Sequence, residues 1–158
     1  MTSSSITYAR VTAEFDRPIE TVWARIACFG GLEDWADGVS ACSVEGKGVG
    51  AIRTVVRNGN SVRERLETID PVKHVLRYQI LPPHSLPAQA VHGNVILRSL
   101  GAGRTEILWR SDATDFTVPP EVIGARIEAF YAASIEGLRR VLESNFPSPF
   151  GRGRGPIA

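Results

Sequence analysis

Residues 52–80, "IRTVVRNGNSVRERLETIDPVKHVLRYQI", decide the fold that this sequence predicts. Three segments rich in β-branched residues, at about 50–57, 61–69 and 73–81, are separated by "NGN" and "DPV", which are typical of tight turns. Short segments of this composition between turn signals predict a meander of three antiparallel strands. The rest of the fold can be built outward from this meander.

A polar residue occurs at the same phase of each of the three strands. If residues 58 and 59 form the centre of a two-residue turn, Arg53 lies opposite Glu64. If residues 70–72 form the next loop, Glu64 lies opposite Tyr78. The two registers pair apolar residues beside this row: Val55 with Val62, Ala51 with Leu66, Val62 with Ile80, and Leu66 with Leu76. They also place Arg65 opposite Arg77 on the other face, an unfavourable pair of like charges.

The row of Arg53, Glu64 and Tyr78 points to the face that its apolar neighbours mark as buried, because side chains two residues apart share a face. A buried carboxylate loses several kcal/mol of hydration unless a cation or hydrogen-bond donors replace the water. Two interpretations fit this row. It is either an ion pair that only orients the strands, or the catalytic part of a cavity that contacts a ligand.

The remaining segments predict strands and helices in separate blocks. Period-two alternation predicts strands at 6–15, 39–45, 88–100 and 103–114. Helical spacing predicts a helix capped by Asp16, with the apolar stripe Ile19, Val22, Trp23 and Ile26, and a short second helix at "LEDWAD", 32–37. A long helix opens at Pro119 and Pro120 and carries the stripe Ile123, Ile127, Phe130, Ile135, Leu138 and Leu142. Segregated elements of this kind predict an α+β fold with an antiparallel sheet.

Three quoted stretches carry a resemblance to a known family. Residues 18–55, "PIETVWARIACFGGLEDWADGVSACSVEGKGVGAIRTV", then 62–80, "VRERLETIDPVKHVLRYQI", and 105–109, "TEILW", precede the long final helix. Over about residues 6–143 this order resembles the SRPBCC superfamily of START-related helix-grip proteins, in its polyketide cyclase/dehydrase-like branch. The resemblance implies a curved antiparallel sheet of about seven strands wrapped around a long C-terminal helix, two short helices after the first strand, and an internal hydrophobic cavity.

The expected cavity would be lined by apolar and aromatic side chains from the sheet and the last helix. The candidates for ligand binding are Trp35, Val55, Val62, Leu66, Leu76, Ile80, Trp109, Ile127 and Tyr131. Trp35 resembles a family tryptophan near the cavity mouth, and it also fits a packing anchor for the short helix. Trp109 fits a cavity wall better than a catalyst. The hydroxyl of Tyr131 could reach the cavity or point outward at the edge of the stripe.

Small residues and histidines leave further alternatives open. Gly93 and the run Ala129, Ala132, Ala133 and Gly137 would leave room for a ligand, and close helix-to-sheet packing explains them equally well. His84 and His92 could act as general bases. The alternation around His92 favours the outer face of the sheet, and His84 lies in a Pro-rich loop that could act as a lid.

Composition limits the classes of partner and site. The 158 residues carry 18 basic and 17 acidic side chains, so no general attraction to nucleic acid or to an anionic membrane is expected. No apolar run reaches membrane-spanning length and no secretory signal opens the chain, which favours a cytoplasmic protein. The two cysteines and three histidines lack metal-ligand spacing, and no nucleotide-binding glycine motif occurs, so we expect neither a metal nor a cofactor.

We therefore expect one ligand-binding domain at 1–145, followed by a flexible Pro/Gly/Arg tail at 146–158, in a monomer or homodimer. Two arginines in that tail are thin evidence for RNA contact. The resemblance implies binding of a hydrophobic small molecule, with cofactor-free proton-transfer chemistry of a lyase or isomerase as one reading. A non-catalytic carrier or sensor resembling lipid-transfer proteins is the alternative. An interaction module acting through a sheet edge or the tail is a third hypothesis.

Overall fold

The computed structural model describes residues 4–144, and the predicted tail at 146–158 lies outside them. A single antiparallel sheet has the strand order β1-β7-β6-β5-β4-β3-β2. Its strands are β1 (Ile6–Phe15), β2 (Val39–Glu45), β3 (Ile52–Arg57), β4 (Asn60–Asp70), β5 (Val75–Leu81), β6 (Gln89–Gly101) and β7 (Arg104–Thr114). The helices are α1 (Ile19–Ala27), the 3-10 turn η1 (Leu32–Asp34) and α2 (Pro120–Ser144).

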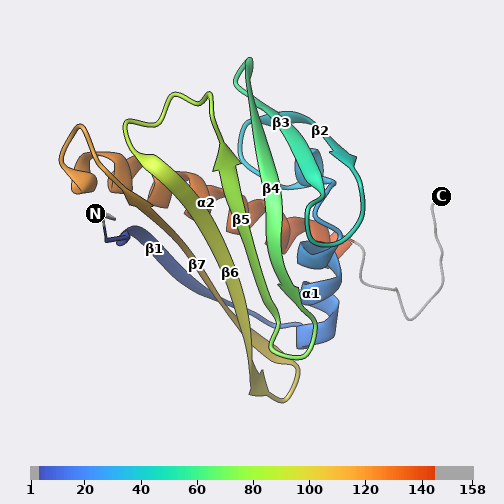
Figure 1. The fold of residues 1–158 in the computed structure, drawn as a ribbon. Coiled ribbons are helices and arrows are strands. Elements are labelled where there is room, and N and C mark those ends of the chain that lie inside the picture. Colours follow the sequence, from blue (N-terminus) through green and yellow to red (C-terminus); the bar gives the residue numbers. More distant parts are fainter. Residues whose placement is uncertain (1–3, 145–158) are drawn as a thin grey trace.

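The seven-stranded sheet is curved, and α2 crosses one of its faces (Figure 1). This arrangement confirms the predicted helix-grip architecture. The domain boundary at 145 stays a prediction. Within residues 4–144, no helix is both long and apolar enough to cross a membrane.

The start of α1 differs from the prediction. Pro18, in an extended conformation, is the N-cap, and no side chain caps the helix there. The Pro18 carbonyl instead accepts hydrogen bonds from the amides of Thr21 and Val22, at 3.0 and 3.3 Å. Asp16 therefore does not cap α1, because the helix begins at Ile19 and Pro18 occupies the N-cap position.

The register between β3 and β4 confirms the prediction. Arg53 pairs with Glu64 and Val55 with Val62. The amide of Leu66 donates to the carbonyl of Ala51 at 2.8 Å, which continues the expected alignment past the end of β3. The Asn-Gly turn therefore sets this hairpin as its sequence implies.

The predicted register between β4 and β5 is wrong. Glu64 pairs with Ile80, and Tyr78 pairs with Leu66. Asp70 ends the hairpin, because its carboxylate accepts hydrogen bonds from the amides of Val72 and Lys73, both at 2.9 Å. The loop is consequently one residue longer than expected, and a bulge follows Leu66 in β4.

The longer loop and the bulge together shift β5 relative to β4 by an even number of residues, so the predicted residues stay on their faces of the sheet. Glu64 and Tyr78 still point inward, but they are diagonal neighbours rather than a direct pair. On the outer face, the predicted pairing of Arg65 with Arg77 is also wrong. Arg65 hydrogen-bonds Gln79 at 2.7 Å, and Arg77 binds Asp112 at 2.9 Å.

Glycines bring α2 close to its neighbours. A Cβ atom on Gly124 would lie 2.1 Å from the Tyr8 carbonyl oxygen, and one on Gly137 would lie 2.1 Å from that of Trp35. Both glycines therefore serve close packing rather than space for a ligand. The alanines grouped with Gly137 in the sequence, at 129, 132 and 133, are exposed and do not face the sheet interior.

Candidate ligand-binding site

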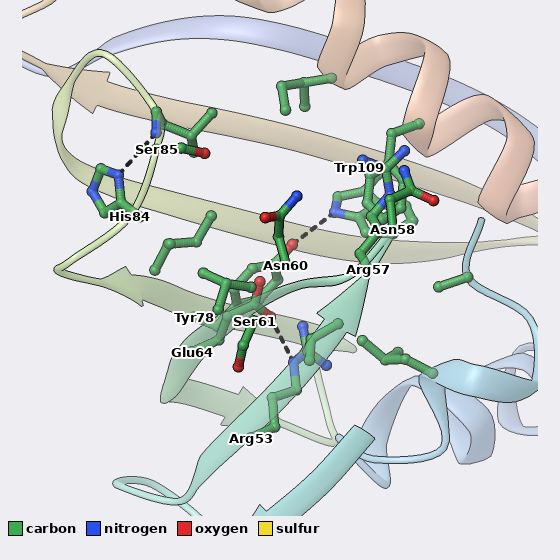
Figure 2. Close-up of a pocket in the computed structure, with 18 of the residues that line it drawn as sticks. Arg53, Arg57, Asn58, Asn60, Ser61, Glu64, Tyr78, His84, Ser85 and Trp109 are labelled. Atoms are coloured by element: carbon green, nitrogen blue, oxygen red, sulfur yellow. Dashed lines mark hydrogen bonds and ion pairs between the residues drawn. The ribbon is translucent and has the colours of Figure 1, made fainter. Parts of the chain in front are cut away.

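A cavity of about 370 Å³ lies between the inner face of the sheet and α2 (Figure 2). Its size is at the lower end of the usual range for small-molecule pockets, about 300–1,000 Å³. The inner wall comes mainly from β3, β4 and β5, and α2 lines the opposite side. Apolar and aromatic lining residues are Ile26, Leu32, Trp35, Ala36, Val55, Val62, Leu76, Tyr78, Ile80, Leu86, Pro87, Val95, Trp109, Ile123, Ile127 and Phe130.

Arg53 is the charged residue that is buried most deeply in this wall, with 5% of its surface exposed. Its Nε donates to Oε1 of Glu64 at 2.7 Å, and its Nη1 donates to the carbonyl oxygen of Phe29 at 2.8 Å. The guanidinium carbon lies 4.2 Å from the Phe29 ring centroid and 4.6 Å from that of Tyr78. Cation–π contacts and charge-assisted hydrogen bonds thus replace much of the water that this cation loses.

The hydrogen bond to Phe29 joins the sheet to the segment that follows α1. Phe29 has φ of 66°, a left-handed conformation that bulky side chains rarely adopt. The Phe29 ring is buried, and its carbonyl is held by Arg53. The buried arginine therefore stabilises a backbone conformation that the local sequence does not favour.

Glu64 is 9% exposed and accepts the Arg53 hydrogen bond through one oxygen only. Its second carboxylate oxygen, Oε2, makes no hydrogen bond with any residue in the described part of the chain, and it is not sealed from solvent. The same holds for Nη2 of Arg53. Both residues line the cavity (Figure 2), and within residues 4–144 their pair keeps one acceptor and one donor without a hydrogen-bond partner.

Tyr78 belongs to an aromatic cluster beside the ion pair. The indole Nε1 of Trp109 donates to the Tyr78 hydroxyl at 3.2 Å, and the Trp109 ring stacks on Tyr131 with centroids 4.0 Å apart. Burial and the neighbouring Glu64 carboxylate raise the pKa of Tyr78 to about 12. Tyr78 is therefore a neutral phenol at ordinary pH, able to donate a hydrogen bond and unable to act as a base.

Gly93 makes room for the Tyr78 ring and not for a ligand. A Cβ atom at Gly93 would lie 2.2 Å from Cζ of Tyr78. The two residues are paired across β5 and β6, so the hydroxyl-bearing end of the ring lies over the position where a side chain is missing. The sequence left open space for a ligand or close helix-to-sheet packing at this glycine, and the structure shows a third cause, packing against the ring of a residue on the neighbouring strand.

The mouth of the cavity is polar and comes from three segments. The β3–β4 turn and the β5–β6 loop lie at the same end of the strands, and the first half of α2 faces them (Figure 1). The polar lining residues of these segments and of the adjoining ends of β3 and β4 are Arg57, Asn58, Asn60, Ser61, His84, Ser85 and Arg126. The amide of Leu86 donates to Nδ1 of His84 at 3.2 Å, which leaves the Nε2 of a neutral His84 as the protonated nitrogen.

Most of the residues chosen from the sequence line the cavity. These are Arg53, Glu64 and Tyr78, together with Trp35, Val55, Val62, Leu76, Ile80, Trp109 and Ile127. Leu66 and Tyr131 do not. Leu66 is 2% exposed inside the core, and Tyr131 is covered by Trp109 with its hydroxyl in a chain that includes Tyr78 and Ser111. What the lining residues do to a ligand stays a prediction.

The two histidines considered as general bases lie on different faces of the molecule's sheet region. His84 is part of the cavity lining, whereas His92 lies on the outer face and contacts Glu67 at 3.0 Å. Sequence reasoning missed the polar mouth as a group, although "NGN" and "PPHS" mark turns whose polar residues could have been considered together. Within residues 4–144, no group of three or more His, Cys, Asp or Glu side chains is placed to hold a metal ion.

Comparisons with known proteins agree with this geometry. The profile of a family described as "Polyketide cyclase / dehydrase and lipid transport" matches residues 8–143. No curated protein matches significantly.

Solved structures share the fold at low sequence identity. An uncharacterised protein from Bacillus thuringiensis has a TM-score of 0.75 at 18% identity, over 89% of this chain and 99% of its own. A protein from Thermobifida fusca gives 0.76 at 18% identity, over 86% and 93% of the two chains. The protein XoxI from Bacillus cereus gives 0.73 at 20% identity, over 85% and 96%.

Proposed function

The chain belongs to the polyketide cyclase/dehydrase and lipid transport family, and from this premise we propose that it binds a hydrophobic small molecule in the cavity beneath α2. The apolar body of the ligand would contact the aromatic and aliphatic wall. An oxygen-bearing group of the ligand would reach the Arg53–Glu64 pair.

One observation carries this proposal: within residues 4–144 the buried ion pair keeps an acceptor and a donor without a partner, and both residues line a cavity. Burial of a charged pair is often no more stabilising than well-packed apolar side chains of similar volume. Beyond the contact of Arg53 with Phe29, stability alone therefore does not explain why the wall contains this ion pair. A ligand hydroxyl, which both donates and accepts, would complete the hydrogen bonding of both groups.

Proton-transfer chemistry is a second candidate, favoured by the placement of Tyr78. Glu64 could accept a proton from the carbon next to a ligand carbonyl, and the guanidinium of Arg53 would stabilise the resulting enolate oxygen. Tyr78, kept neutral by its raised pKa, would donate a hydrogen bond in the same region. A carrier or sensor would use the same groups only to orient the ligand.

Native mass spectrometry of freshly purified protein tests the proposal, with calorimetric titration of decan-1-ol as a defined probe. We expect a compound to co-purify. We also expect Glu64→Gln to weaken decan-1-ol binding by about tenfold, the effect of losing a hydrogen bond to a charged group. Glu45→Gln is the matched control, because Glu45 is exposed and lies outside the cavity.

The two candidates differ in the fate of the bound compound. Release of an unchanged compound supports a carrier, and its conversion on incubation, abolished in Glu64→Gln, supports catalysis. Circular dichroism would verify that each variant is folded. A folded protein that neither retains a compound nor binds decan-1-ol would refute the proposal.

A further inference from the structure

The charges that line the cavity are unbalanced. Three guanidinium groups, those of Arg53, Arg57 and Arg126, accompany one carboxylate, that of Glu64. Arg53 and Glu64 neutralise one another at 2.7 Å in the inner wall. The remaining excess of positive charge therefore belongs to the mouth, where Arg57 and Arg126 lie.

Arg126 has no partner of its own in the described part of the chain. It is exposed on the first half of α2 and makes no hydrogen bond or ion pair with residues 4–144. Side chains three and four residues away are its neighbours on the helix. These are Val122, Ile123, Ala129 and Phe130, none of which is acidic.

Arg57 is held in place beside the same turn of α2. Its guanidinium carbon lies 4.2 Å from the centroid of the Phe130 ring, and Phe130 is one helical turn from Arg126. The Nε of Arg57 donates to the carbonyl oxygen of Asp37 at 2.9 Å. The Asp37 carboxylate, 3.5 Å away, is 52% exposed, so water screens it and it offsets the Arg57 charge only in part.

Resting on the proposed function, we infer that the ligand carries an anionic end group, a carboxylate or a phosphate, which Arg126 and Arg57 hold at the mouth while the apolar body occupies the cavity. The opposite orientation is unfavourable, because the Glu64 carboxylate would repel an anion in the inner wall. An anion at the mouth keeps part of its hydration and gains the donors that surround it. Those donors include Asn58, Asn60, Ser61, Ser85 and the Nε2 of His84.

Calorimetric titration of the full chain with four decyl compounds tests this inference. Decanoate and decyl phosphate carry the two anionic end groups, decan-1-ol is the neutral reference, and decyltrimethylammonium is the cationic one. We expect at least one anion to bind about tenfold more tightly than decan-1-ol at low salt. The preference should shrink as ionic strength rises, while decan-1-ol binding stays constant.

Variants of α2 identify the residue that is responsible. Arg126→Gln should weaken binding of the preferred anion by about fivefold relative to binding of decan-1-ol, and Arg126→Glu should favour decyltrimethylammonium over the anion. Arg140→Gln is the matched control, since Arg140 is exposed on the same helix and does not line the cavity. The comparison of decanoate with decyl phosphate decides which anionic group fits.

The outcomes separate this inference from the proposed function. If decan-1-ol binds and both anions bind no more tightly, the inference is wrong and binding in the cavity stands. Equal effects of Arg126→Gln and Arg140→Gln would also overturn the inference. If none of the four compounds binds, both the inference and the proposed function fail.

Discussion

Removal of one partner from the Arg53–Glu64 pair should destabilise the fold far more than removal of a surface pair. Two unit charges about 4 Å apart attract by roughly 4 kcal/mol at an effective dielectric constant of 20. A buried pair that loses one member typically costs about 3–5 kcal/mol. Glu64→Gln keeps the shape of the side chain and one hydrogen-bond acceptor. We therefore expect the low end of this range, a loss of about 3 kcal/mol in the free energy of unfolding. Arg53→Met should cost a similar amount.

The double variant Arg53→Met/Glu64→Gln leaves no uncompensated charge in the wall. It should therefore lose much less than the sum of the two single variants, with a coupling free energy of about 2–3 kcal/mol. Urea unfolding followed by tryptophan fluorescence measures these values, since the chain has three tryptophans and Trp35 and Trp109 line the cavity.

Arg98 and Glu106 form the matched control pair. They are directly opposite one another on β6 and β7, 3.1 Å apart, with side chains 67% and 30% exposed. The same cycle on this pair should give a coupling of at most about 1 kcal/mol. Equal coupling free energies for the two pairs would refute the reasoning, because they would mean that water screens Arg53 and Glu64 as it screens a surface pair.

Two further predictions concern the aromatic cluster. Gly93→Ala should lower the free energy of unfolding by about 2 kcal/mol, because its new Cβ overlaps the Tyr78 ring. The same substitution should cost much less in a Tyr78→Ala background. An equal loss in both backgrounds would show that the ring is not the obstacle. The pKa of Tyr78 is raised from its ordinary value of about 10 to about 12, which contributes about 3 kcal/mol to the free energy of unfolding. This contribution is complete below pH 10 and is lost as pH rises through about 12. Burial also raises the pKa of Tyr8 and Tyr131, the other two tyrosines, so tyrosinate absorbance should appear at higher pH in the folded protein than in urea, and coincident titrations would contradict the burial.

The sequence predicts the faces of the strands better than their registers. Side-chain alternation places Arg53, Glu64 and Tyr78 on the inner face, and the structure agrees. The pairing of β4 with β5 depends on where the loop closes, which Asp70 decides by accepting two backbone amides. The sequence does not distinguish an Asp that pairs in the strand and caps the following turn from an Asp that is the first residue of the loop. The predicted loop is therefore one residue too short.

The bulge after Leu66 is a second feature without a sequence signal, because it inserts one residue into an otherwise regular strand. The mouth of the cavity was missed for a different reason. Periodicity identifies residues that share a face of one element, whereas Arg57, His84 and Arg126 come from a strand end, a loop and a helix. Only the tertiary fold brings such residues together.

The division of the cavity into an inner wall and a polar mouth has a consequence for how this scaffold can diversify. The wall is shared with the hydrophobic core, so a substitution there changes ligand preference and foldability at once. The β3–β4 turn and the β5–β6 loop contribute Asn58 and Ser85 to the entrance from exposed positions. Exchange of these two loops between distant relatives should therefore change which ligands the protein binds while the fold stays intact.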